Sequence, residues 1–165
     1  MALTTTLTYK ISTVLTKALQ QTTPTDTLAK DLSDTLASGI NKDEADTVFH
    51  DIRTLAKNAA ENIDLNGGFN DPLGDSATLT KLKGLVIHNR STTVGDNLLI
   101  GGGATNFKLF KDLTGRYELG PDGIMSMWEP SLAGKTVTAA TADLLRVENQ
   151  GTGSISYDLI VIGIK

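Results

Sequence analysis

From about residue 78 onward, the chain consists of short apolar runs separated by turn-forming residues. The clearest run is LKGLVIHN at 82–89, and the last run, at 155–164, begins with alternating polarity and ends continuously apolar. The last run fits a strand that is wet on one face at its start and buried on both faces toward its end. Further strands are expected at 97–100, 107–110, 117–119, 124–128, 135–139 and 144–148. About seven or eight strands spaced by about 8–12 residues predict a mainly β chain with an antiparallel β-sandwich or jelly-roll-like domain.

The first residues alternate between apolar side chains and threonine. Leu3, Leu7, Tyr9 and Ile11 have a rough period of two, which predicts a strand at 3–12. A Thr-rich strand of this kind can add to the sheet of a neighbouring subunit through its backbone hydrogen bonds. These four residues are therefore candidates for partner binding.

The segment between this strand and the β domain has mixed patterns. Apolar residues at positions 28, 29, 32 and 36 have helical spacing and predict a helix at 27–36, and a second, short helix is expected at 42–50 before an extended path. The expected organisation is an N-terminal arm or extension at 1–40, a mixed helical and extended connector at 41–77, and the sandwich at 78–165. Because residues 1–40 are polar and Thr-rich, we expect them to become ordered in an assembly.

Composition narrows the functional classes. Hydrophobic residues make up 39% of the chain and charged residues 21%, which is ordinary for a folded domain. The net charge of −4 and the lack of a basic patch argue against nucleic acid as a partner. No cysteine is present, which excludes disulfides and thiolate metal sites. We expect neither a signal peptide nor a membrane span, because no suitable apolar stretch is found.

The letters Gly134-Lys135-Thr136 match the end of a phosphate-binding P-loop. That loop requires a glycine five positions before Gly134, where this chain has Glu129, whose carboxylate would repel a phosphate. The residues after Lys135 favour a strand, so no helix N-terminus would point at the anion. We interpret this stretch as a turn that enters a strand.

The other catalytic and nucleotide-binding patterns are also incomplete. Residues 101–106 match a dinucleotide fingerprint only at the first glycines, 43–46 spell a helicase box without its strand, and 74–78 miss the nucleophile elbow of hydrolases. His50 and His88 have no nucleophile or further metal ligand nearby in the sequence, so we expect solvent-facing or capping roles. The sequence predicts no catalytic residue, no cofactor and no enzyme activity; a hydrolase built on His50 is a remote alternative.

Two features keep binding functions open. Asp64, Asn66, Asn70 and Asp71 form an oxygen-rich cluster that is a weak calcium candidate, although the EF-hand positions are not matched and turn chemistry explains the same residues. Trp128 is expected in the core or at a subunit interface, and is the fifth candidate for partner binding. Alternatively, Trp128, Tyr117 and the loop at 101–105 could form a carbohydrate-binding face.

Several stretches in order resemble a group of small virion structural proteins of tailed phages, encoded in the head region. They are LKGLVIHN at 82–89, IGG at 100–102, GPDG at 120–123, WEP at 128–130, VTAATADLLRVEN at 137–149 and YDLIVIG at 157–163. The resemblance covers roughly residues 40–165. The group's pattern is T-A-G-T-A-D where this chain has Ala140 in place of the glycine, which removes the residue type that favours a tight bulge there.

The resemblance implies a virion structural protein, most plausibly a decoration or cement protein bound to the outside of the capsid. Its partners would be the major capsid protein or other virion proteins, and it would be synthesised in the host cytoplasm. A homo-oligomer is expected, with a trimer favoured over a dimer because trimers suit local three-fold positions of a shell. A head–tail connector, a head-fibre base and a tail protein are the alternatives within the virion.

Overall fold

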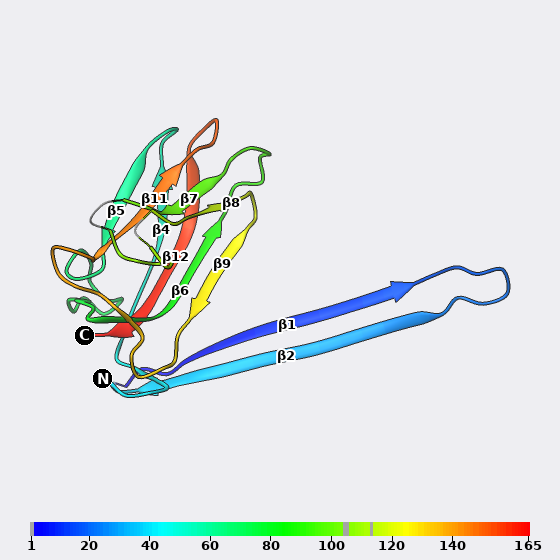
Figure 1. Cartoon of the computed structure of the whole chain (residues 1–165), viewed down its shortest axis with the longest axis horizontal. Coiled ribbons are helices and arrows are strands. Elements are labelled where there is room, and N and C mark those ends of the chain that lie inside the picture. The colour runs from blue at the N-terminus through cyan, green and yellow to red at the C-terminus, as the bar shows by residue number, and fades with distance from the viewer. Residues whose placement is uncertain (1, 104–105, 113) are drawn as a thin grey trace.

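The computed structural model of the protein describes residues 2–103, 106–112 and 114–165, and over these residues it contains strands and no helix. Figure 1 shows two parts: a body of packed strands and a long two-stranded arm that projects from it. The mainly β fold class predicted from the sequence is confirmed.

Twelve strands follow one another in the described residues. β1 (Thr5–Thr16) and β2 (Thr25–Ser38) form the arm, and the short β3 (Glu44–Ala45) pairs with the end of β2. The strands of the body are β4 (Thr47–Leu55), β5 (Ala60–Asp64), β6 (Lys81–Asn89), β7 (Leu98–Gly101), β8 (Arg116–Leu119), β9 (Ile124–Trp128), β10 (Lys135–Thr136), β11 (Leu144–Asn149) and β12 (Ile155–Ile164).

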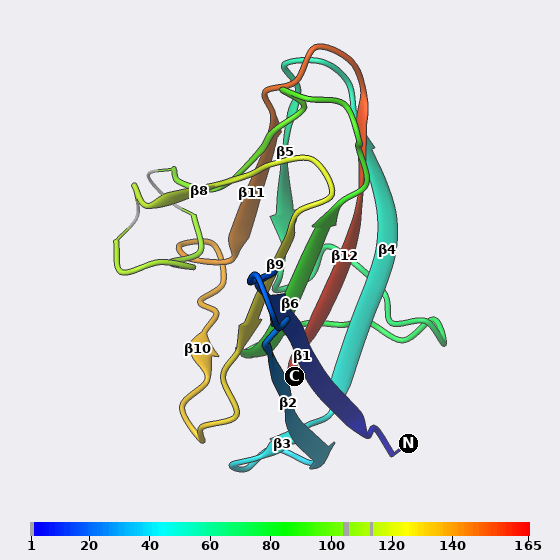
Figure 2. The same ribbon diagram turned by 90° about the vertical axis from the view of Figure 1, so that its right-hand side faces the viewer.

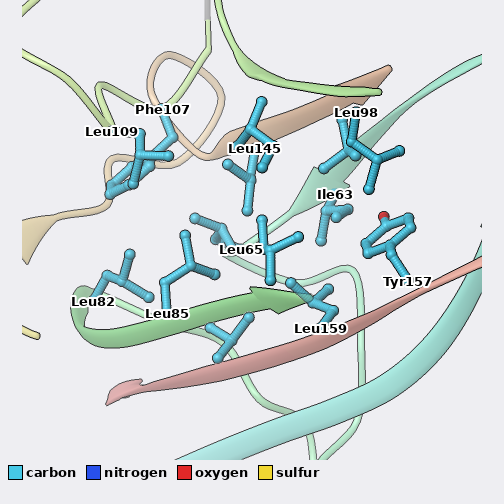
Figure 3. Packing of buried hydrophobic residues seen from close by; sticks show 14 of the residues in the cluster. Ile63, Leu65, Leu82, Leu85, Leu98, Phe107, Leu109, Leu145, Tyr157 and Leu159 are labelled. Atoms are coloured by element: carbon cyan, nitrogen blue, oxygen red, sulfur yellow. The ribbon is translucent and has the colours of Figure 1, made fainter. Parts of the chain in front are cut away.

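The body is a sandwich-like pair of sheets. In one sheet the order is β10-β6-β12-β4, with β9 also paired to β6, and the other sheet has the order β5-β11-β7-β8. All neighbours within these two sheets are antiparallel. Buried apolar side chains of both sheets fill the space between them (Figure 3). Burial alternates along β11 and the first half of β12, while the last four residues of β12 are all buried, as the polarity pattern predicts.

Most strands of the body agree with the sequence pattern. The strands predicted at 82–89, 97–100, 117–119, 124–128, 144–148 and 155–164 are present, with ends shifted by at most one residue. The predicted strand at 135–139 is reduced to β10, and the predicted run at 107–110 is not a strand. Phe107 and Leu109 are buried in the core from a loop, so their apolar character reflects burial and not strand pairing.

Both predicted helices are wrong. Residues 27–36 belong to β2, and residues 42–50 contain a turn, β3 and the start of β4. Along β2, Leu28, Leu32 and Leu36 are spaced by four residues, which is close to one helical turn of about 3.6 residues and equals two strand periods of about 2 residues. Pairing with β1 decides the structure, since every residue of β2 up to Leu36 has a partner there. Residues 41–77 also supply β4 to one sheet and β5 to the other.

Two fully buried asparagines fix loops to the body. The Asn149 Nδ2 donates to the carbonyls of Leu55, Ala56 and Gly153 at 2.8–3.0 Å, and its Oδ1 accepts from the Gly151 N–H at 2.7 Å. Asn89 makes an equivalent set of bonds to the carbonyls of Asp96, Leu119 and Gly120. Each amide therefore satisfies backbone groups that would otherwise be buried without partners.

The turn before β11 retains a left-handed residue despite the absence of glycine. Ala140 has a φ of 62°, and its N–H donates to the Asp143 carboxylate at 2.5 Å, while Thr138 and Ala142 form an isolated bridge. An L-residue with a side chain in this region costs about 1–2 kcal/mol relative to glycine. A tight turn is thus present at Ala140 without a glycine.

This strain gives a direct test. We expect Ala140→Gly to raise the free energy of unfolding by about 0.5–1 kcal/mol, because it relieves the left-handed strain but adds freedom to the unfolded chain. Urea unfolding followed by circular dichroism measures the change. Ala139→Gly is the matched control and should be destabilising, since Ala139 has a negative φ; equal effects of both substitutions would contradict this account.

Candidate partner-binding arm

The arm is a regular antiparallel hairpin of β1 and β2. Twelve residue pairs run from Thr5 opposite Leu36 to Thr16 opposite Thr25. Residues directly opposite each other point to the same side of a hairpin, and side chains alternate along each strand. One side of the arm is consequently apolar at most positions, and we call it the arm face; its apolar members are Leu7, Tyr9, Ile11, Leu15, Leu28, Leu32 and Leu36, and Asp26, Lys30 and Asp34 lie among them.

The other side of the arm is polar. It carries mostly threonine, serine and charged residues, and hydroxyl groups pair across the strands: Thr6 with Thr35 at 3.0 Å and Thr8 with Ser33 at 3.2 Å. β-branched threonines fit this half-exposed strand surface well. The Thr-rich composition near the N-terminus is thus the solvent side of an amphipathic hairpin.

The root of the arm is attached to the five-stranded sheet at β9. The Trp128 indole N–H donates to the Asp34 carboxylate at 2.7 Å, and the Tyr9 hydroxyl donates to the Ser126 hydroxyl. Trp128 lies directly over Gly84 of β6, where a Cβ would meet the indole at 3.1 Å. Leu36, Ala45 and Ile162 form a small buried cluster at the same place, with Leu3 and Trp128 packed against it.

Hydrogen bonds connect the segment that follows the arm to residues 130–131, just before β10. The buried Lys83 donates its Nζ to the carbonyls of Ser131 and Asn41, and the Asp43 N–H donates to the Pro130 carbonyl at 2.8 Å. Burial lowers the pKa of the Lys83 ammonium. Gly134 adopts a φ of 54° in a turn that enters β10, so the interpretation of Gly134-Lys135-Thr136 as a turn before a strand is confirmed.

The five residues predicted to bind a partner lie along the arm and at its root. Leu7, Tyr9 and Ile11 belong to the arm face, while Leu3 and Trp128 lie at the root. The sequence interpretation missed the other half of the arm face, Leu15, Leu28 and Leu32. The sequence interpretation placed Leu28 and Leu32 in a helix. Every second residue from 28 to 36 lies on the arm face, with Lys30 and Asp34 between the leucines, so a strand period of two would have placed Leu28, Leu32 and Leu36 on one side.

The oxygen-rich cluster at 64–71 supports turns. The Asp64 carboxylate accepts from the Asn66 N–H at 2.8 Å, and the Asp71 carboxylate accepts from the N–H groups of Leu73 and Asp75. Asn66 donates to the Leu79 carbonyl at 2.7 Å, and Asn70 forms an isolated bridge with Ser76. In the described residues, no group of three or more His, Asp or Glu side chains is arranged to hold a metal ion. A calcium role for this cluster stays a prediction.

The two histidines lie on the same exposed side of the five-stranded sheet. His88 Nδ1 is 2.9 Å from the Asp158 carboxylate, which also accepts from Arg90 at 2.8 Å. These hydrogen bonds, that from His88 first, lower the pKa of the Asp158 carboxyl. His50 is exposed and lies two residues from Ile52, which is paired with Asp158 across β4 and β12. No serine or threonine is paired with His50 among the described hydrogen bonds.

The lowered pKa of Asp158 predicts a pH dependence. Because the folded-state pKa is depressed, the pairing stabilises the fold above the unfolded carboxyl value near 3.9 and is lost as the pH falls through the lower folded value. We expect Asp158→Asn to reduce the free energy of unfolding at pH 7 by about 0.5–1 kcal/mol, and the difference from the wild type to shrink as the pH falls below the unfolded carboxyl value near 3.9. Urea unfolding across this range measures it. Asp31→Asn on the polar side of the arm is the control, and a difference for Asp158→Asn that does not change with pH would contradict the assignment.

The residues considered for carbohydrate binding are dispersed. Trp128 lies at the arm root in the five-stranded sheet, whereas Tyr117 is on β8 in the four-stranded sheet. Of the loop at 101–105, residues Ala104 and Thr105 lie outside the described residues. The structure therefore does not bring Trp128 and Tyr117 into a common face.

Comparisons with protein-family models, curated proteins and solved structures found no match to this chain. Among the described residues there is also no helix of the length and apolar character that crossing a membrane requires.

Proposed function

We propose that the protein is a virion structural protein of a tailed phage, and specifically a decoration or cement protein that binds the outside of the capsid and stabilises the assembled shell. The observation that carries this proposal is the projecting amphipathic arm. The sequence resemblance described above supplies the class of assembly. A jelly-roll arrangement of the sandwich is part of the same proposal.

The arm supports an assembly role because a projecting hairpin with an exposed apolar face is energetically unfavourable in solution. A two-stranded hairpin is at best marginally stable when isolated, and an exposed apolar face adds an aggregation hazard. Leu15 is 71% exposed and Leu28 is 51% exposed, so the outer part of the arm face is not covered by the described residues. A protein that retains such an element gains from it when other subunits cover it.

In this proposal the protein stabilises the capsid shell by mass action. A protein that binds the assembled shell and has no affinity for the separated capsid subunits stabilises the shell in proportion to its occupancy. The partners are the major capsid protein or other virion proteins, with the chain itself present as a homo-oligomer, for which we favour a trimer. The acidic net charge suits an outer location away from packaged DNA.

A neck, head-fibre or tail location is the second candidate within the virion. The arm also suits these locations, and copy number separates them from the shell. No described contact favours the carbohydrate-binding alternative, because Trp128 is hydrogen-bonded to Asp34 at the arm root.

The test is quantitative mass spectrometry of purified virions, together with cosedimentation of the full chain with shells that lack it. The proposal predicts a copy number comparable to that of the major capsid protein's assembly units, and saturable binding to assembled shells but not to unassembled capsid subunits. A few copies per particle, or cofractionation with isolated tails, would contradict a decoration role and favour the neck or tail alternative.

A further inference from the structure

The outer edge of β2, on the side away from β1, is a long strand edge that is paired only at the root of the arm. There the N–H groups of Ala37 and Gly39 donate to carbonyls of the segment around β3 at 2.9 and 3.1 Å. Figure 2 shows β3 at this end of β2, and among the described residues no strand pairs with the outer edge at 25–36. Every residue from 25 to 35 is exposed. An unpaired edge of this length is a template for pairing with another chain.

The free backbone groups of this edge belong to the odd-numbered residues of β2. The N–H groups of Ala37 and Gly39 point away from β1, and the direction of these groups alternates along a strand. The odd-numbered residues at 25–35 therefore present their N–H and C=O groups to the outer edge. The even-numbered residues, whose side chains form the β2 half of the arm face, direct their backbone groups to β1. If a second β2 strand pairs with this edge, its odd-numbered residues must lie opposite the odd-numbered residues here.

Two charged residues of β2 have no opposite charge beside them in their own hairpin. Lys30 and Asp26 each lie opposite an apolar residue of β1, and neither forms an ion pair among the described residues. The other two charged residues of β2 are placed differently: Asp31 lies opposite Lys10, and Asp34 accepts the indole hydrogen bond at the arm root. Lys30 and Asp26 are four residues apart on the same side of one strand, so a second, antiparallel copy of that strand can match both charges at once.

We propose that the outer edge of β2 pairs with the same edge of a second copy of this chain, in antiparallel orientation, about a two-fold axis at Leu28. In this register Leu28 lies opposite its counterpart, and Lys30 of each copy lies opposite Asp26 of the other, so both charges gain a cross-strand partner. Residues 25–31 of the two copies form four hydrogen-bonded pairs, which gives about eight backbone hydrogen bonds. The two arms then make one four-stranded sheet with both arm faces on the same side.

The other registers centred within 26–32 fail on charge or on space. An axis at position 26, 30 or 31 places a charged residue opposite its own counterpart, and an axis at 27 or 29 places a leucine opposite a charged residue. An axis at Leu32 pairs Lys30 with Asp34, but the second copy then runs past position 36 into β3. The axis at Leu28 fits the free edge, because it places the turn of the second arm, at 20–21, beside residues 35–36, directly before β3.

Pairing through the same edge of both copies closes after two copies, so it forms a dimer and not a fibre. The free edge of β1 offers no equivalent charge pattern, since Lys10 is the one charged residue of that strand. The contact requires only copies of the chain and does not depend on the capsid role. A two-fold contact of this kind can also join copies that belong to two neighbouring trimers.

The absence of cysteine allows a test by disulfide formation in the full chain. Leu28→Cys places a thiol directly opposite its counterpart, at a Cα separation of about 4.5 Å, which a disulfide can span. Leu32→Cys is the matched control, because Leu28 and Leu32 are each 51% exposed and share one side of β2. In the proposed register the two copies of residue 32 are about 26 Å apart. With copper–phenanthroline and air as the oxidant, we expect Leu28→Cys to form the linked dimer at least about tenfold faster than the control.

Light scattering on the full chain tests the charge pairing. The unmodified protein should have a mass that is an even multiple of 17.5 kDa. Lys30→Asp and Asp26→Lys, made singly, are each expected to lower the association constant by about tenfold, since each places like charges opposite each other twice. The double variant that carries both substitutions restores opposite charges, and we expect its association constant within about threefold of the wild type.

Equal oxidation rates for the two cysteine variants, a double variant as weak as the single ones, or a monomer at about 50 μM would overturn the proposal. A monomer that binds capsid shells, and loses this binding in Lys30→Asp, would assign the edge of β2 to the capsid protein and refute the second copy. A dimer that does not bind shells would refute the capsid role and leave the pairing of the arms standing, so the two proposals fail separately.

Discussion

Asn149→Asp is expected to lower the free energy of unfolding by about 3–5 kcal/mol. The amide Nδ2 of Asn149 satisfies three backbone carbonyls, and the side chain is fully buried between the β4–β5 turn and the β11–β12 loop. A carboxylate of the same shape has no N–H to donate, and it would place negative charge against three carbonyl oxygens. Urea unfolding of both proteins at pH 7 measures the difference.

The control for this substitution is Gln21→Glu in the exposed loop of the arm. It also replaces an amide with an acid and changes the net charge by the same amount, but it breaks no described hydrogen bond. We expect an effect within about 0.5 kcal/mol there. A loss of less than about 1 kcal/mol for Asn149→Asp would show that the buried amide is not what fixes the two loops.

Replacing Leu15 and Leu28 together by Glu is expected to weaken binding to assembled shells by about 100-fold or more. Two carboxylates on the arm face would have to be desolvated in any contact that covers it, including the contacts of the proposed homo-oligomer. A single copy then binds the shell through one attachment, whereas an oligomer binds through several. Cosedimentation with purified shells over a range of protein concentrations gives the two apparent affinities.

The polar side of the arm offers a matched control. Val14 and Thr27 are the chain neighbours of Leu15 and Leu28, they are exposed, and they face the opposite side of the hairpin. Val14→Glu with Thr27→Glu adds the same charge at the same height along the arm, and we expect an affinity within about threefold of the wild type. If both double variants lost binding equally, charge on the arm and not its apolar face would be responsible.

Much of the body could be predicted because burial on one or both faces of a strand leaves a clear trace in the sequence. β6, β11 and β12 are recognisable from their alternating and continuous apolar residues. The arm was predicted only in its first strand. The spacing of Leu28 and Leu32 fits both a helix and a strand. Pairing with β1 decides between them, and this pairing cannot be read from the local sequence.

The contacts that define the candidate site were beyond sequence reasoning for a similar reason. Trp128 and Asp34 are 94 residues apart, and His88 and Asp158 are 70 residues apart, so each pair exists only once the strands are in register. Trp128 was nevertheless selected as a partner-binding candidate, and it lies at the root of the arm. Its hydrogen bond to Asp34 connects the arm to β9 of the five-stranded sheet.

The most direct test of the proposed role is a cryo-EM reconstruction of the native virion. The account predicts many copies at symmetry-related positions on the outside of the shell, with the arm face of each copy covered by a neighbouring protein. Copies confined to the neck or the tail, or arms on the shell that project freely into solvent, would contradict it.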